Sequence, residues 1–143
     1  MTGRVRYEVD DMGAAFVTLD APESRNALSD ELLDDLLDAF ERARTDDAVR
    51  VVVLTSSHDR VFSAGGDLKA FAGAAPTIGK YAGLDRFPRL YKLIGGLGKP
   101  VICAANGDVL AGAFGLALAC DLVIAREASG SGARRSTWAC SRS

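Results

Sequence analysis

Apolar and polar positions divide the first part of the chain into short strands and a helix. Two short segments, residues 5–9 and 14–19, flank a four-residue turn and predict a pair of strands. Apolar residues alternate with charged ones in the first segment and predominate in the second. Leucines and a phenylalanine then recur at helical spacing over residues 30–44, directly behind Ser29, a residue type that favours the N-cap position. The pattern therefore predicts a strand pair followed by an amphipathic helix.

Three later runs are almost entirely apolar, and they cover residues 49–54, 101–105 and 121–125. Such runs are typical of strands that are buried on both faces of a parallel sheet. Helical patterns at 85–94 and 112–120 lie between them. Because strands that alternate with helices pair in parallel through right-handed crossovers, the sequence predicts an α/β fold with parallel strands backed by helices.

Composition and charge narrow the possible functions. The 143 residues carry a net charge of −2, which gives no support for binding to nucleic acid or to an anionic membrane. His58 is the only histidine, and the three cysteines lack metal-ligand spacing, so we predict no metal site. Cys103 and Cys120 lie in apolar runs and are expected to be buried. The chain shows no signal peptide or membrane-spanning run, so the expected location is the cytoplasm.

Two glycine-rich segments each follow a predicted buried strand. They are residues 61–69, VFSAGGDLK, and residues 105–115, ANGDVLAGAFG. Small residues let a ligand approach the backbone, and unpaired amides at a helix start point outward beside the positive end of the helix dipole. Two such amides converging on one oxygen would form an oxyanion hole for a thioester that loses an α-proton.

Two other interpretations of these glycines remain open. The first is that they only permit close packing of a helix on a sheet. The second is a phosphate-binding loop, although neither the Walker pattern nor the G-x-G-x-x-G pattern is present.

Three segments resemble the crotonase (enoyl-CoA hydratase/isomerase) family. Residues 19–28, LDAPESRNAL, resemble its N-terminal signature, and residues 62–69 resemble its first oxyanion loop. Residues 99–125 resemble its second signature almost continuously. The resemblance implies the N-terminal part of the crotonase (ClpP-like) spiral, with parallel strands backed by helices. It also implies a homotrimer or hexamer, although a chain that covers only the N-terminal half is a doubtful member of such an assembly.

The resemblance implies roles for residues in both glycine-rich segments. It assigns the two backbone amides of an oxyanion hole to Gly66 and Gly112. It assigns substrate binding to Ala64, Gly66, Asp67, Leu68, Lys69 and Gly112. Lys69 would face a CoA phosphate or be an ordinary surface lysine. The implied ligand is an acyl-CoA or enoyl-CoA thioester, with coenzyme A as part of the substrate and no separate cofactor, and neither nucleic acid nor a membrane is an expected partner.

The sequence departs from the hydratase pattern at both catalytic positions. The resemblance implies a first catalytic Glu three residues after Gly112, where this chain has Gly115. It implies a second Glu near Arg135, which lies in the C-terminal segment. The resemblance implies a protein of the enoyl-CoA hydratase or isomerase type that binds an acyl-CoA or enoyl-CoA, and the missing Glu residues leave its catalytic activity open. The alternative is a catalytically dead truncated product or a non-catalytic acyl-CoA binder.

The last sixteen residues differ from the rest of the chain. Residues 128–143 are mostly Gly, Ser, Ala and Arg, without periodicity, so we divide the chain into a truncated crotonase core, 1–127, and an unstructured tail, 128–143. A lost base near the start of the tail would explain this composition, because the codons across Arg134 and Arg135 can encode Glu in the shifted frame. We predict an out-of-frame tail, and a natural unstructured C-terminus is the alternative.

Overall fold

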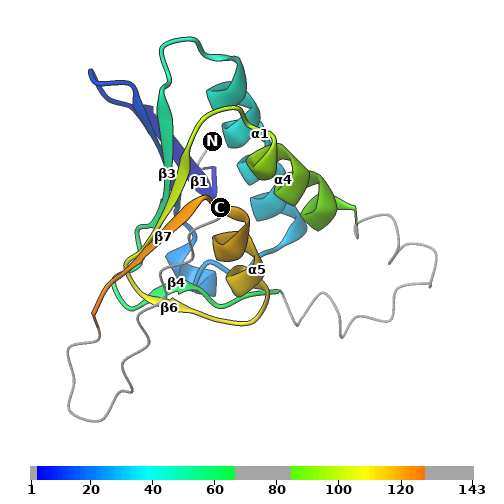
Figure 1. Ribbon diagram of the computed structural model, residues 1–143. Coiled ribbons are helices and arrows are strands. Elements are labelled where there is room, and N and C mark those ends of the chain that lie inside the picture. Colours follow the sequence, from blue (N-terminus) through cyan, green and yellow to red (C-terminus); the bar gives the residue numbers. More distant parts are fainter. Residues whose placement is uncertain (1–2, 67–84, 128–143) are drawn as a thin grey trace.

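The computed structural model of the chain describes residues 3–66 and 85–127 (Figure 1). In chain order the elements are β1 Val5–Val9, β2 Ala14–Leu19, the 3-10 helix η1 Pro22–Ser24, α1 Asp30–Thr45, β3 Val51–Ser56, β4 Val61–Ser63, α4 Arg86–Gly95, β5 Val101–Ala105, β6 Asp108–Val109, α5 Gly112–Ala119 and β7 Leu122–Ala125. The predictions for Asp67, Leu68, Lys69 and the tail concern positions outside the described residues.

Five strands form one sheet in the order β1-β2-β3-β5-β7. β1 and β2 pair antiparallel, and every later pair in this sheet is parallel. Helices α1 and α4 pack beside the sheet, as Figure 1 shows. This arrangement confirms the predicted α/β class with a mostly parallel sheet backed by helices.

Helix α1 shows why one face of the sheet is well covered. Ser29 caps it, because the Ser29 Oγ accepts a hydrogen bond of 3.3 Å from the Leu32 amide. Its apolar stripe is buried, including Leu32, Leu36 and Phe40. At the other end, the Lys99 Nζ donates hydrogen bonds of 2.6 Å to two main-chain carbonyls, where a cation also stabilises the negative end of the helix dipole.

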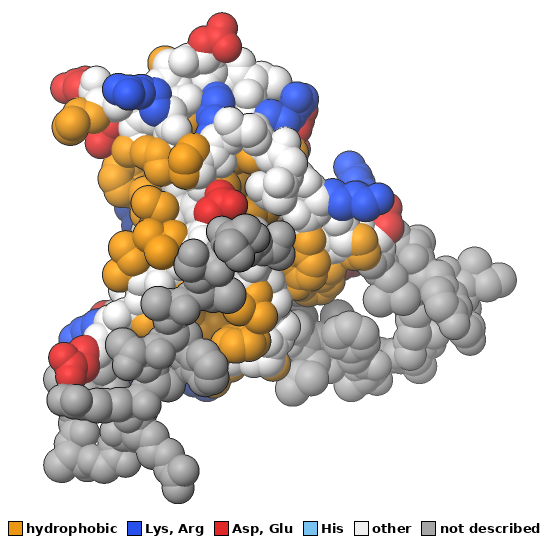
Figure 2. All heavy atoms as spheres, in the orientation of Figure 1, with side chains coloured by type: hydrophobic (Ala, Val, Ile, Leu, Met, Phe, Trp, Pro, Cys, Tyr) orange, Lys and Arg blue, Asp and Glu red, His pale blue; other side chains and the backbone are white. Residues whose placement is uncertain are grey.

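The opposite face of the sheet corrects one prediction. Strands β3 and β5 alternate between buried and half-buried residues, and β7 is largely exposed. An apolar row formed by Phe16, Val53, Ile102 and Leu122 crosses four strands on this face. Figure 2 shows hydrophobic side chains gathered on the left of the molecule, where Figure 1 has the sheet. The prediction of burial on both faces is therefore wrong within the described residues, because α1 and α4 cover only one face.

Strands β4 and β6 pair in parallel as a second, two-stranded sheet. The sequence patterns missed both, and placed a loop and a turn there instead. With three and two residues, neither strand is long enough to display an alternation of polar and apolar positions.

The prediction for two cysteines is confirmed, because Cys103 and Cys120 are free and buried. A hydrogen bond with the Cys103 thiol, together with burial, raises the pKa of the Cys120 thiol. A raised pKa keeps this thiol protonated, so it behaves as a small apolar side chain.

Candidate functional site

The small sheet brings the two glycine-rich segments together. The Asp108 amide donates to the Arg60 carbonyl at 2.9 Å, and the Leu110 amide donates to the Ser63 carbonyl at 3.1 Å. Gly107 permits this pairing, because a Cβ there would lie 2.6 Å from the Arg60 carbonyl carbon. The loop that leaves β4 therefore lies directly against the loop that leaves β6.

Backbone packs on backbone where these two loops meet. A Cβ on Gly65 would lie 2.7 Å from the Leu110 carbonyl oxygen and 3.0 Å from the Gly112 nitrogen. Conversely, a Cβ on Gly112 would lie 3.4 Å from the Gly66 nitrogen. The backbones of Gly66 and Gly112, the two residues that the sequence singled out, are thus neighbours in space.

Both glycine amides lack a hydrogen-bond acceptor within the part of the chain that the structure describes. Neither the Gly66 amide nor the Gly112 amide donates to a described residue. Gly112 is the first residue of α5, a position at which a helix leaves its amide without an internal partner. Ala64, also predicted to bind substrate, is half-buried in the first loop, and its amide donates to the Arg25 carbonyl at 2.9 Å.

Asn26 holds the first loop from within the core. It is fully buried, and its Oδ1 accepts a hydrogen bond of 2.7 Å from the Ala21 amide. Its Nδ2 donates to the Ser56 Oγ at 2.7 Å and to the Phe62 carbonyl at 3.0 Å. One side chain from the segment 19–28 therefore ties β3 and β4 together immediately before the first glycine loop.

Ser63 extends this bracing into the loop itself. Its buried Oγ donates to the Asn26 carbonyl at 2.7 Å and accepts from the Gly65 amide at 3.2 Å. The Leu28 amide donates to the Gly65 carbonyl at 2.8 Å. Gly65 has φ +88°, a conformation that glycine adopts readily and other residues rarely do.

The second loop contains a strained residue. Ala111 has φ 46° and ψ −121° and immediately precedes Gly112. The Ala113 amide donates to the Leu110 carbonyl at 3.0 Å, so residues 110–113 form a tight turn in which glycine is preferred at the position of Ala111. Backbone strain of this kind is common beside functional sites.

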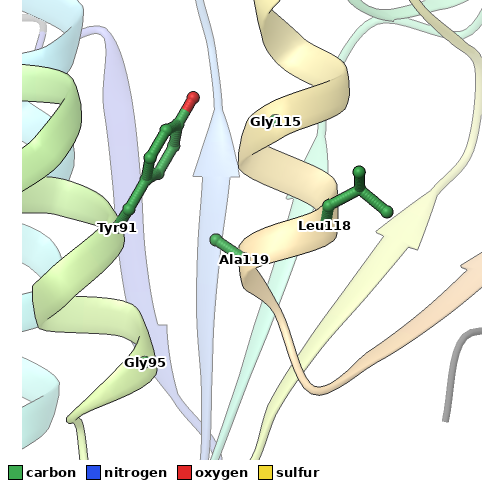
Figure 3. Close-up of a pocket in the computed structure, with 5 residues that line it drawn as sticks. All are labelled: Tyr91, Gly95, Gly115, Leu118 and Ala119. Atoms are coloured by element: carbon green, nitrogen blue, oxygen red, sulfur yellow. The ribbon is translucent and has the colours of Figure 1, made fainter. Parts of the chain in front are cut away.

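One turn further along α5, the Tyr91 side chain fills the space above Gly115. The Tyr91 hydroxyl oxygen lies 2.7 Å from the position that a Cβ on Gly115 would occupy. Figure 3 shows the ring extending from α4 alongside α5, with the hydroxyl at the level of Gly115. Burial raises the pKa of Tyr91, so the phenol stays protonated at neutral pH.

Sequence reasoning missed three contributors to this site. The identity of Asn26 was part of a recognised segment, but no pattern indicated its hydrogen bonds. For Ser63, the signal in the sequence was a polar side chain within an apolar run. Tyr91 gave no signal, because its contact with Gly115 depends on how two helices pack. No cluster of His, Cys, Asp or Glu suited to a metal ion occurs in residues 3–66 and 85–127.

Comparison with known proteins identifies the family. Residues 10–136 match the model of the enoyl-CoA hydratase/isomerase family. A Thermus thermophilus protein named "Putative enoyl-CoA hydratase" is 41% identical over 123 residues, which are 84% of this chain and 48% of that protein. The Arabidopsis thaliana protein "Probable enoyl-CoA hydratase 2, mitochondrial" is 37% identical over 85% of this chain and 40% of its own.

Solved structures agree with the sequence matches. An enoyl-CoA hydratase/isomerase from Xanthobacter autotrophicus superposes with a TM-score of 0.79 and 35% identity, covering 87% of this chain and 46% of the other. The chain belongs to the enoyl-CoA hydratase/isomerase family, and it spans less than half the length of these relatives. The predicted recognition and fold, the N-terminal portion of a crotonase, are confirmed. None of the described helices could traverse a lipid bilayer.

Proposed function

We propose that this chain binds an acyl-CoA or enoyl-CoA thioester, with the thioester oxygen accepting hydrogen bonds from the Gly66 and Gly112 amides. The observation that carries the proposal is the close approach of the two loops, in which a Cβ on Gly112 would lie 3.4 Å from the Gly66 nitrogen. Family membership supports the choice of a coenzyme A thioester as the ligand.

The chemistry that such a pair of amides promotes is formation of an enolate. When the α-carbon of a thioester loses a proton, negative charge develops on the carbonyl oxygen. Two amides already fixed in position stabilise this charge without reorganising, and the positive end of the α5 dipole adds to the effect. The side chains of Asp67, Leu68 and Lys69 are proposed to contact the coenzyme A portion.

We propose two candidate functions for a chain that binds such a thioester. The first is the hydratase or isomerase type that the family suggests. The second is a binder without turnover, which is favoured by the composition of α5: its sequence, GAFGLALA, has no ionisable side chain, and Gly115 cannot transfer a proton. A location in the cytoplasm is a further proposal, whereas one relative carries "mitochondrial" in its name.

An infrared measurement tests the proposed hydrogen bonds directly. Crotonyl-CoA labelled with ¹³C at the thioester carbonyl should show a lower carbonyl stretching frequency when it is bound to the full chain. An ester in place of the peptide bond between Ala111 and Gly112 removes one donor without changing the shape of the backbone, so this frequency shift should shrink. An ester between Gly112 and Ala113 is the control, because the Ala113 amide already donates to Leu110.

Two results of this experiment would contradict the proposed hydrogen bonds. An unshifted carbonyl band in the bound ligand, or the same shift in both esters, would refute the proposed oxyanion hole. Turnover of crotonyl-CoA by the same protein, followed by loss of the enoyl absorbance, separates the enzyme from the binder.

A further inference from the structure

An open pocket lies between α4 and α5, beside the proposed thioester site. It has a volume of about 250 Å³ and is lined by Tyr91, Gly95, Gly115, Leu118 and Ala119 (Figure 3). All of these except Tyr91 are glycines or apolar residues. The Tyr91 hydroxyl is therefore the only polar side-chain group among the lining residues.

The Tyr91 hydroxyl has no partner in the part of the chain that the structure describes. No hydrogen bond joins it to a described residue, and it is not one of the buried polar atoms that lack a partner. It is 2.7 Å from the place of a Gly115 Cβ, so the absence of a side chain at position 115 is what makes room for it. In Figure 3 the hydroxyl points along α5 away from Ala119, toward the end of the helix where the chain enters it.

That end of α5 carries the Gly112 amide. Gly112 and Gly115 are three residues apart, so they share a helix face and differ by about 4.5 Å along the axis. A thioester oxygen held at Gly112 would place the next carbons of the acyl group within one helical turn of the Tyr91 hydroxyl. The lining of glycines, Leu118 and Ala119 suits an acyl group better than the polar coenzyme A portion, so we infer that the acyl group extends toward the Tyr91 hydroxyl.

We propose that Tyr91 determines acyl specificity by donating a hydrogen bond to an acceptor oxygen on the acyl group, so that the pocket prefers 3-oxoacyl thioesters to plain acyl thioesters. This inference rests on the proposed function. A protonated phenol is a donor that gains most from an acceptor in surroundings with few competing polar groups. A thioester without such an oxygen leaves the hydroxyl without a partner in the occupied pocket.

Two thioesters of equal chain length test this specificity. Acetoacetyl-CoA carries a carbonyl oxygen on the third acyl carbon, whereas butyryl-CoA carries none there. With the full chain, calorimetric titration should give tighter binding for acetoacetyl-CoA. Tyr91→Phe keeps the ring and removes the hydroxyl, so it should weaken the binding of acetoacetyl-CoA by about threefold to tenfold, the value of one hydrogen bond. The binding of butyryl-CoA should stay unchanged or become slightly tighter, because the variant has no hydroxyl to leave without a partner.

Gly115→Ala provides an independent variant. Its added Cβ would displace the Tyr91 hydroxyl, and alanine favours a helix more than glycine does, so the fold is not at risk. It should reduce the preference for acetoacetyl-CoA in the same way. In the double variant with Tyr91→Phe no further loss is expected, because the hydroxyl is already absent.

The possible results separate this inference from the proposed function. If the parent chain binds both thioesters but Tyr91→Phe weakens both equally, or neither, Tyr91 only packs and the inference is wrong. If the parent chain binds neither thioester, the proposed function itself fails, and the specificity inference fails with it.

Discussion

The two glycine loops that meet at the candidate site are held in place by different means. The first loop is held by side chains, because Asn26 from a distant part of the chain and Ser63 from the adjoining strand form hydrogen bonds around Gly65. The second loop depends on main-chain hydrogen bonds to β4 and contains a strained alanine at position 111. We infer from this difference that the first loop is the more rigid partner and that the second loop takes its shape by packing against it.

The largest expected effect comes from placing a side chain between the two loops. Gly65→Ala combines an unfavourable φ with contacts below 3.0 Å to Leu110 and Ala111, so we expect a loss of at least about 3 kcal/mol in unfolding free energy. Gly98→Ala is the control, because Gly98 has φ +77° but nothing within 4 Å of its Cβ position. The Gly98→Ala variant should lose only about 1 kcal/mol in unfolding free energy. Equal losses in urea titrations would mean that the loops are not in tight contact.

Removing the central brace of the first loop should have the next largest effect. Asn26→Ala deletes three buried hydrogen bonds, and at about 1 kcal/mol each the expected loss is about 3 kcal/mol. Asn106 is its counterpart before the second loop. Its Nδ2 donates to the Ser56 carbonyl at 2.8 Å and to the His58 carbonyl at a long 3.4 Å, but its buried Oδ1 has no partner among the described residues, and removing this unpaired oxygen offsets part of the loss. Asn106→Ala should therefore cost about 1 kcal/mol or less. Similar losses in the two variants, measured by urea denaturation, would contradict the proposed asymmetry.

A smaller effect is expected at Ser63. Ser63→Ala removes one hydrogen bond to the Asn26 carbonyl and one from the Gly65 amide, and it should reduce the unfolding free energy by about 1.5 kcal/mol. Because Ser63 and Asn26 belong to one network, the double alanine variant should lose less than the sum of the single losses. Strict additivity in a double-mutant cycle would show that the two side chains act independently.

The smallest effect should have the opposite sign. Ala111→Gly relieves the positive φ of Ala111, so a gain in unfolding free energy of about 0.5–1 kcal/mol is expected. The matched control is Ala113→Gly, two positions further on in a buried part of α5, which should lose about 1 kcal/mol. A loss in both variants, measured by thermal unfolding, would show that Ala111 is not strained in solution.

The sequence predicted long elements well and short ones poorly. Helix α1 was expected over 30–44 and spans Asp30–Thr45, since its apolar stripe repeats over four turns. β4 and β6 were missed because elements of three and two residues depend on pairing with each other rather than on a local pattern. These short strands are the elements that bring the site together.

The sequence indicated which two backbone segments lie side by side, but not which side chains meet across helices. Gly66 and Gly112 were found through the family resemblance, and the structure brings them together. Tyr91 lies 24 positions before Gly115, and no periodicity within either helix encodes the contact between them. The predicted burial of strands on both faces was wrong because an apolar run records the polarity of a segment, and not whether a helix covers it.

The order of the strands in the large sheet has a consequence for how the chain folds during synthesis. Along β1-β2-β3-β5-β7 the spatial order is the order of translation, so each strand pairs with one that has already left the ribosome. No later strand has to insert between two strands that have already paired. Assembly can therefore proceed stepwise from the N-terminus, with the most recently added strand always serving as the edge for the next.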